Sequence, residues 1–150
     1  MIDVNGIAHV NLTVARFEEC KAFYKALLPF LGLKLVFDGE SMCYHVGSRT
    51  GIAIQKCAPE YTSDRFNQER PGLHHLCFRA RSLEDVDTVF HFLQTLKAHI
   101  ISPPQEGPWA PGYYYLLFED PDGIRIEINH VPGKGVFGEK AGFSAGGDYH

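Results

Sequence analysis

Short segments in which apolar and polar residues alternate follow one another along this chain, with amphipathic or turn-rich stretches between them. Residues 7–14 (IAHVNLTV) alternate with a period of two, which predicts a β-strand. Residues 16–31 carry apolar side chains at helical spacing, which predicts an amphipathic helix that ends near Gly32. Hairpin-like connections then join three further predicted strands, at 33–38, 42–46 and 51–56.

The same order of elements returns in the second half of the chain. Residues 73–80 (LHHLCFRA) predict a strand, and Ser82 can cap a helix over 83–97. Strands are expected at 98–102, 113–119 and 123–129, the last two joined by an Asp-Pro-Asp-Gly turn. The repeat predicts an α+β fold of two βαβββ modules, at about 5–57 and 72–130, with residues 57–72 as a linker or lid.

The length of 150 residues is that of one ordinary domain, and we expect a single domain over residues 1–130. Residues 131–150 are Gly-rich and irregular. We expect them to form a C-terminal tail that is mobile or laid on a partner subunit.

Composition narrows the classes of partner. The net charge of −4 offers no basic surface for nucleic acid and no polybasic patch for a membrane. No apolar run approaches the roughly 20 residues of a membrane span, and the N-terminus does not resemble a signal peptide. The four cysteines show no CxxC spacing, so we expect reduced thiols in a cytoplasmic protein.

Three residues carry most of the candidate chemistry: His9, His75 and Glu127. Each is expected in the middle of a predicted strand, on a polar face whose reverse side is apolar, so these faces are expected to line a cavity. Two imidazoles and one carboxylate can hold a divalent metal with open coordination positions. Any one of the three has a structural interpretation by itself, and their matched places in the two repeats favour the metal site.

Gln55 is a fourth candidate ligand, because it lies near the end of the fourth strand of the first repeat, the place expected to match Glu127. An amide oxygen is a weak neutral ligand, and the sequence leaves its participation open. The identity of the metal is open too, since Ni, Co, Zn, Fe and Mn all accept nitrogen and oxygen ligands.

The stretches HVNLTV, AFYKALLPFLGL, GLHHLCFRA and FEDPDGIRIEI together resemble the vicinal oxygen chelate superfamily, which includes glyoxalases, bleomycin-resistance proteins and dioxygenases. The resemblance covers about residues 7–130 and implies paired βαβββ modules cupped around a divalent metal. It implies metal ligands at His9, Gln55, His75 and Glu127, and a homodimer. The ligand set is similar to that of methylmalonyl-CoA epimerase, whereas EDPDGIRIEI is more like glyoxalase I and fosfomycin-modifying proteins.

Two departures from the family pattern bear on the reaction. Leu117 stands where extradiol dioxygenases have a tyrosine, which disfavours a dioxygenase. Gln55 stands where many glyoxalases have a glutamate, so a proton-transfer reaction would need another base. Asp38, Glu40 and His45 are candidates for that base, with no sequence feature to choose among them.

Two further residues near the candidate site are Tyr115 and His74. Tyr115 is expected either to donate a hydrogen bond to a substrate oxygen or to serve as strand packing. His74 is expected on the face opposite His75.

The sequence therefore predicts a metal-dependent lyase or isomerase that acts on a small oxygen-chelating substrate, with Glu127 and Tyr115 as the candidate catalytic residues. An Fe(II) dioxygenase of the same fold is one alternative. A metal-free protein that binds a small molecule, such as a drug-resistance protein, is another.

Overall fold

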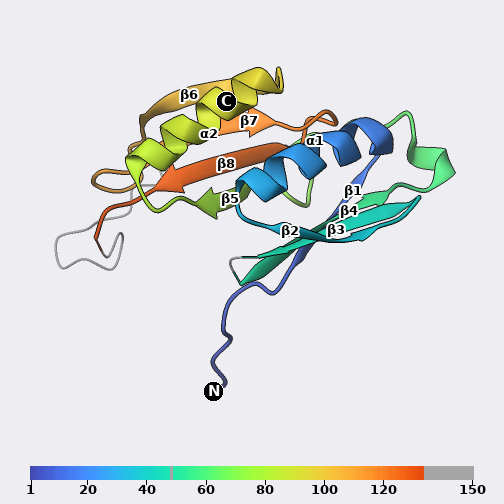
Figure 1. The fold of residues 1–150 in the computed structure, drawn as a ribbon, viewed down its shortest axis with the longest axis horizontal. Coiled ribbons are helices and arrows are strands. Elements are labelled where there is room, and N and C mark those ends of the chain that lie inside the picture. The colour runs from blue at the N-terminus through green and yellow to red at the C-terminus, as the bar shows by residue number, and fades with distance from the viewer. Residues whose placement is uncertain (48, 134–150) are drawn as a thin grey trace. The chain divides into compact units, whose positions relative to one another are not determined.

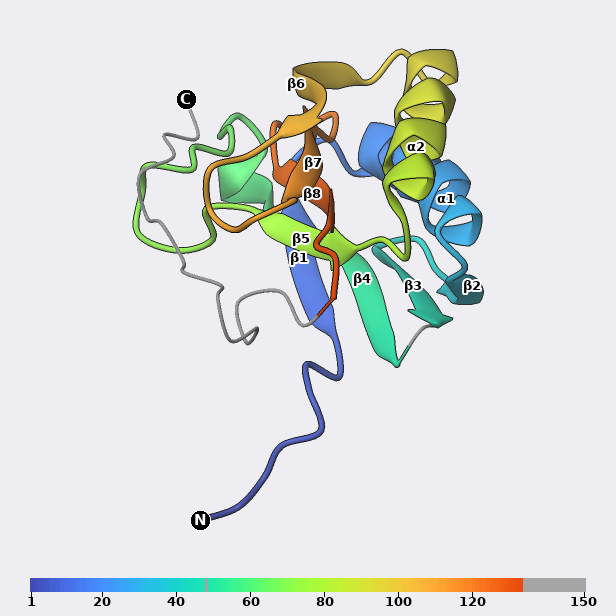
Figure 2. The ribbon, with the colours of Figure 1, turned by 90° about the vertical axis from the view of Figure 1, so that its left-hand side faces the viewer.

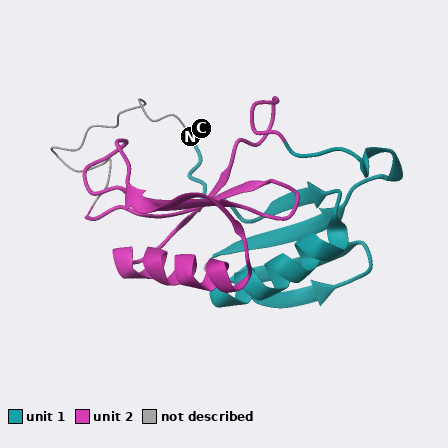
Figure 3. Cartoon of the chain, turned by 90° about the horizontal axis from the view of Figure 1, so that it is seen from above, with its two compact units in different colours: residues 1–66 teal, residues 67–150 magenta. Residues whose placement is uncertain are grey.

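The computed structural model describes residues 1–47 and 49–133. Most of the predicted tail, residues 134–150, therefore lies outside the described residues. The chain divides into two compact units, residues 1–66 and 67–150 (Figure 3). Each unit contains one four-stranded mixed sheet and one long helix.

Unit 1 is a βαβββ module (Figure 1). Its elements are β1 (Val10–Val14), α1 (Phe17–Phe30), β2 (Lys34–Asp38), β3 (Met42–Gly47) and β4 (Thr50–Lys56). The strand order is β1-β4-β3-β2, with β1 parallel to β4 and the other neighbours antiparallel. A short 3-10 helix, Pro59–Tyr61, follows β4.

Unit 2 repeats this topology. Its elements are β5 (Leu76–Arg79), α2 (Leu83–Thr95), β6 (His99–Glu106), β7 (Tyr114–Glu119) and β8 (Arg125–His130). The strand order is β5-β8-β7-β6, and β5 runs parallel to β8. Figure 2 shows this sheet from the side, with α2 along one of its faces. The predicted α+β fold of two βαβββ modules is confirmed.

Each helix buries one stripe of side chains against its own sheet. In unit 1 the buried stripe of α1 is Phe17, Cys20, Phe23, Tyr24, Leu27 and Leu28. In unit 2 the buried residues of α2 are Val86, Val89 and Leu93. The helix α2 begins at the predicted cap, because Ser82 Oγ accepts a hydrogen bond of 3.1 Å from the Asp85 amide. One face of each sheet thus packs on the helix of its own unit.

Two strand boundaries differ from the prediction in a way that affects the candidate site. The first strand of each unit begins one residue after its histidine, so His9 and His75 precede β1 and β5 instead of lying in mid-strand. Glu127 does lie within its strand, β8.

The strand β6 is longer than predicted and continues through Pro103 and Pro104 to Glu106. Its pairing with β7 shifts register between Ile100 and Ser102 and again between Ser102 and Gln105. These irregularities on an edge strand accommodate the two prolines, which cannot donate hydrogen bonds to a regular ladder. No helix among the described residues is long and apolar enough to cross a membrane.

Candidate metal-binding site

The polar face of unit 2 is centred on β8. Its side chains alternate, so that Ile126 and Ile128 lie on the face that packs on α2 while Glu127 lies on the other. Glu127 is flanked by Cys77 on β5 and by Leu117 on β7, and its side chain is completely buried. A buried carboxylate needs a partner of positive charge or several hydrogen-bond donors. The groups that contact the two carboxylate oxygens of Glu127 therefore show how its buried charge is stabilised.

His75 is the nearest basic group to Glu127. It comes two residues before Cys77, so its side chain lies on the same face as Glu127. His75 Nε2 is 3.3 Å from Glu127 Oε2, an ion-pair distance. Oε2 is nevertheless buried and accepts no well-formed hydrogen bond from any described residue. The structure thus brings two of the predicted ligands together, with one carboxylate oxygen left for a further partner.

The other carboxylate oxygen of Glu127 is occupied. The hydroxyl of Tyr113 donates a hydrogen bond to Oε1, and the side-chain amide of Asn129 donates one of 2.7 Å to the Tyr113 hydroxyl. Burial acts to raise the pKa of Glu127, but the contacts with His75 and Tyr113 outweigh it and hold this pKa below its ordinary value. Glu127 is therefore a carboxylate at neutral pH.

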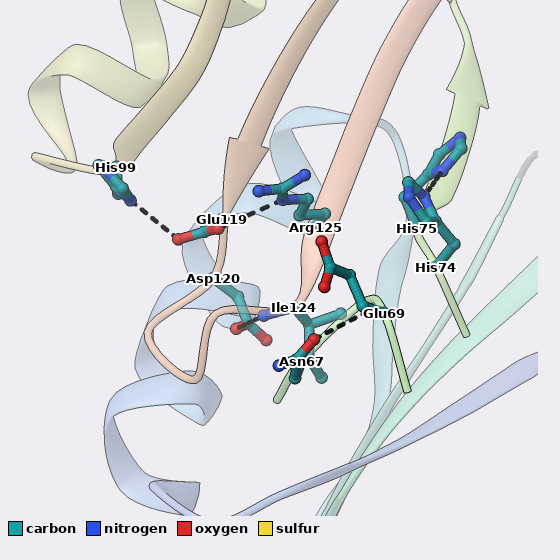
Figure 4. Close-up of polar contacts among 9 residues, drawn as sticks. All are labelled: Asn67, Glu69, His74, His75, His99, Glu119, Asp120, Ile124 and Arg125. Atoms are coloured by element: carbon teal, nitrogen blue, oxygen red, sulfur yellow. Dashed lines mark hydrogen bonds and ion pairs between the residues drawn. The ribbon is translucent and has the colours of Figure 1, made fainter. Parts of the chain in front are cut away.

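The ring of His75 is held on its far side by His74. The two Nδ1 atoms are 2.8 Å apart, and the ring planes meet at 80° (Figure 4). One Nδ1 donates and the other accepts, and when His75 is the donor its Nε2 keeps a lone pair for a metal. Burial, and then the charge of His75, lower the pKa of His74, which favours its neutral form. His74 was expected on the opposite face and instead lies beside His75.

Arg125 shares the face of Glu127 but is engaged elsewhere. Its Nε lies 3.4 Å from Glu119 Oε1, and Glu119 Oε2 lies 2.8 Å from His99 Nδ1 (Figure 4). With the amide of Gln68 turned so that its oxygen faces the guanidinium, that oxygen accepts a hydrogen bond of 2.9 Å from Arg125. Arg125 is buried, and its contacts with Glu119 and Gln68 stabilise this end of the sheet.

In unit 1, His9 is exposed, and its ring meets that of Tyr44 edge to face with centroids 6.5 Å apart. The ring of Tyr44 in turn lies over Gly51, where a Cβ atom would collide with it. The absence of a side chain at Gly51 therefore gives Tyr44 its place beside His9.

Gln55 does not occupy the place that matches Glu127. In unit 2, Glu127 pairs with Cys77, two residues after the histidine; in unit 1 the residue two after His9 is Asn11, and it pairs with Ala53. Gln55 pairs with Thr13, four residues beyond His9 and about 13 Å along the strand. Its Oε1 accepts a 3.0 Å hydrogen bond from Asn11. The structure does not bring His9 and Gln55 together.

The tyrosine next to the carboxylate is Tyr113, not the predicted Tyr115. Tyr115 is buried against Trp109 and Leu117, and its hydroxyl accepts a 3.3 Å hydrogen bond from Gln105. This agrees with the packing alternative for Tyr115. Strand alternation and the family resemblance put Tyr113 on the same face as Tyr115, toward the site, but gave no reason to choose Tyr113 over Tyr115.

Two of the candidate bases have other roles. Asp38 is paired with Lys21 at 2.6 Å and Lys25 at 2.5 Å, and their hydrogen bonds lower its pKa to about 2. His45 is completely buried, and neither of its ring nitrogens has a hydrogen-bond partner among the described residues. It pairs with Ile52 on the side of the sheet that faces α1. Asp38 is thus engaged by two lysines and His45 is enclosed in the core, whereas Glu40, the third candidate, is exposed.

Residues 6–128 match the Glyoxalase/Bleomycin resistance protein/Dioxygenase superfamily. The chain belongs to this superfamily. It is 29% identical over 122 residues to the uncharacterized protein YqjT of Bacillus subtilis (strain 168), a match that covers 80% of this chain and 94% of YqjT.

Solved structures of superfamily proteins share the fold. A candidate glyoxalase of Bacillus halodurans has a TM-score of 0.75 at 27% identity, over 85% of this chain and 96% of that one. A glyoxylase/bleomycin resistance protein/dioxygenase domain of Frankia sp. EAN1pec has a TM-score of 0.69 at 26% identity, over 85% and 98%. A lactoylglutathione lyase of Agrobacterium tumefaciens has a TM-score of 0.63 at 20% identity, over 85% of this chain and 94% of that one. At this identity the similarity extends to the fold and not to the activity.

The donor atoms around Glu127 fit a divalent cation. A buried, ionised oxygen that has no well-formed hydrogen bond from the part of the chain that the structure describes lies beside an imidazole nitrogen. Nitrogen and oxygen donors of this kind are those that such ions prefer. Within residues 1–47 and 49–133 no three His, Cys, Asp or Glu side chains gather closely enough to form a complete metal site. His75 and Glu127 thus supply part of a ligand set, and a third ligand is needed to complete it.

Proposed function

We propose that this protein is a divalent-metal-dependent enzyme that binds a small substrate through two neighbouring oxygen atoms. The proposed ligands are His75 and Glu127, with His9 as the third. Gln55 is not among the proposed ligands, because the register of β1 with β4 pairs it with Thr13, four residues beyond His9. The observation that carries the proposal is the buried oxygen Oε2 of Glu127. It lies 3.3 Å from His75 Nε2 and accepts no well-formed hydrogen bond within residues 1–47 and 49–133.

The residues of unit 2 would prepare this site before any ion arrives. Glu127 is kept ionised and supplies the negative charge, while the contact with His74 fixes the ring of His75. A bound divalent ion would act as a Lewis acid toward the substrate oxygens. Two imidazoles and one carboxylate leave open coordination positions, enough for a substrate that chelates through two oxygens.

The reaction we favour is a lyase or isomerase reaction, in which negative charge that develops on the substrate is stabilised at the site. Such a reaction also moves a proton. Asp38 is disfavoured as the base by its ion pairs with two lysines, and His45 is disfavoured by its complete burial. The proton would then be exchanged by Glu40, by water or by the substrate itself.

An Fe(II) oxygenase is the second candidate function. It is supported by the register of β1 and β4, in which Ala53 and not Gln55 pairs with Asn11, so that the proposed ligand set is two histidines and one carboxylate. That triad is typical of non-haem Fe(II) oxygenases and leaves room for a chelating substrate and a gas molecule. Leu117, in place of the expected tyrosine, counts against it.

The test is the metal content of untagged full-length protein, measured by mass spectrometry beside Glu127→Ala and His9→Ala. We expect about one equivalent of a transition metal in the wild type and a loss in both variants. Ser102→Ala, on the edge strand β6, is a control that keeps the metal. If the wild type contains no metal and takes none up, the enzyme proposal is wrong, and a metal-free binding protein becomes the better account.

A further inference from the structure

Glu127 is the end point of a short chain of hydrogen bonds on the polar face of unit 2. Asn129 lies two residues further along β8 and donates to the hydroxyl of Tyr113, which donates to Glu127 Oε1. The phenol hydroxyl has one hydrogen to give and accepts through its lone pairs. The amide of Asn129 therefore orients the hydroxyl so that its hydrogen is directed to the carboxylate.

The position of Tyr113 is itself fixed by its loop. The backbone amide of Tyr113 donates to Ala110 O at 3.0 Å, and its carbonyl accepts from Gly107 at 2.8 Å. The ring of Trp109 packs edge to face on the ring of Tyr113, with centroids 5.1 Å apart. Trp109 can lie there because Gly107 has no side chain; a Cβ atom at this position would collide with the indole. A residue held at both its backbone and its ring is suited to fixing another.

We propose that Tyr113, held by Asn129, is a positioning residue that gives Glu127 a single free oxygen. With Oε1 bound to the phenol, only Oε2 is available to a cation, and it is directed to the side of His75. Glu127 is thereby restricted to binding through one oxygen, and the coordination position that a second oxygen would take stays open. This inference rests on the proposed metal-dependent function and adds a determinant of the geometry of that site.

A buried carboxylate can rotate about its last bond and present either one or both oxygens. A charge-assisted hydrogen bond from the half-buried Tyr113 removes this freedom, since rotation would break that bond within the protein. Groups that orient metal ligands in this way typically change metal affinity by about 10- to 100-fold when they are removed.

The experiment is a titration of metal-free full-length protein with Co²⁺, because the absorption bands of this ion respond to its coordination number. Tyr113→Phe removes only the hydroxyl. The matched control is Tyr115→Phe, which removes a hydroxyl bound to Gln105 from a ring packed on the same tryptophan. We expect about tenfold weaker Co²⁺ binding and altered visible bands for Tyr113→Phe, with Tyr115→Phe like the wild type.

A second variant tests whether Asn129 acts through Tyr113. Asn129→Ala by itself should weaken Co²⁺ binding by less than Tyr113→Phe does. Combined with Tyr113→Phe it should have no further effect, because the hydroxyl through which it acts is gone. Thermal unfolding of the metal-free variants checks that the fold is kept.

The outcomes separate this inference from the function on which it rests. If the wild type binds Co²⁺, Glu127→Ala does not, and Tyr113→Phe has the affinity and bands of Tyr115→Phe, the positioning role is wrong while the metal site stands. Full additivity of Asn129→Ala and Tyr113→Phe also overturns it. If the wild type itself binds no Co²⁺, the metal-dependent function fails, and the role of Tyr113 fails with it.

Discussion

His75 Nε2 and Glu127 Oε2 lie 3.3 Å apart because β5 and β8 run side by side in parallel, with Cys77 opposite Glu127. The pairing of the two strands therefore brings together two of the three proposed metal ligands. A site held by backbone register is rigid, and the effects of changing its residues should appear in binding more than in folding.

Glu127→Gln should separate these two effects. The amide keeps an oxygen to accept the hydrogen bond from Tyr113 but loses the negative charge. We expect metal affinity to fall by more than about a hundredfold, while the unfolding free energy of the metal-free protein changes by no more than about 1 kcal/mol. Isothermal titration with Co²⁺ and urea unfolding measure the two quantities. A variant that kept its metal affinity would exclude Glu127 as a ligand.

Gln55→Ala should leave metal binding unchanged. Gln55 is paired with Thr13 and bonded to Asn11, away from the end of β1 where His9 lies. We expect a Co²⁺ dissociation constant within about twofold of the wild type, a change far below the effect of losing a ligand. His9→Ala, measured in parallel, is expected to weaken binding strongly. A loss with Gln55→Ala equal to that with His9→Ala would restore Gln55 to the ligand set.

His45 should make unit 1 less stable in mild acid. Burial, and then the charge of Lys25, lower its pKa below the ordinary value of 6.5. The unfolded chain then binds a proton that the folded chain does not, so stability falls as the pH drops below about 6.5 toward the folded pKa, by at most about 1.4 kcal/mol per pH unit.

Urea unfolding at pH 7.5 and pH 5.5 measures this loss. In His45→Leu the loss should be smaller, because the buried group no longer titrates. Asp38, whose charge acts on His45, has its pKa lowered to about 2 and does not contribute in this range. An equal loss in the variant and the wild type would assign the acid sensitivity to other histidines.

Ser82→Ala should lower the unfolding free energy by about 1 kcal/mol, since the first turn of α2 loses the acceptor for the Asp85 amide. Ser82→Asp keeps an acceptor there and should retain most of the stability. Urea unfolding compares the two variants. Equal stability of the alanine and aspartate variants would show that the cap contributes nothing.

Gly107→Ala should displace the indole of Trp109, on which the rings of Tyr113 and Tyr115 pack. Because Trp109 is the only tryptophan of the chain, its fluorescence reports this change directly. We expect a red-shifted emission, since the buried ring becomes more exposed to water. Pro108→Ala, which adds no atom beside the indole, should keep the wild-type spectrum.

The sequence was sufficient for the features that depend on local pattern. Alternation along 7–14 correctly placed Leu12 and Val14 in the core and left Asn11 and Thr13 exposed. Helical spacing predicted the buried stripe of α1, and the residue type of Ser82 predicted the cap of α2. These features follow from side-chain periodicity and from hydrogen bonds between near neighbours.

The features that the sequence did not determine depend on pairing between distant segments. Gln55 was matched to Glu127 by counting along the chain, whereas the register of β1 with β4 gives that place to Ala53. Tyr113 and Tyr115 share one face in any alternating strand, and only the fold of the 107–113 loop shows which one reaches Glu127. Register and loop conformation are tertiary properties, so periodicity alone could not supply them.

The two modules differ at one position on their polar faces, where unit 1 has Ala53 and unit 2 has Glu127. In the second module Glu127 pairs with Cys77, the second residue after His75. In the first module the corresponding residue, which pairs with Asn11, is Ala53. Alanine and glutamate are neighbours in the genetic code, so a lineage with this fold lies one short mutational step from an additional acidic ligand, without any change of backbone. The asymmetry between the repeats thus allows the charge near His9, one of the proposed metal ligands, to change during divergence.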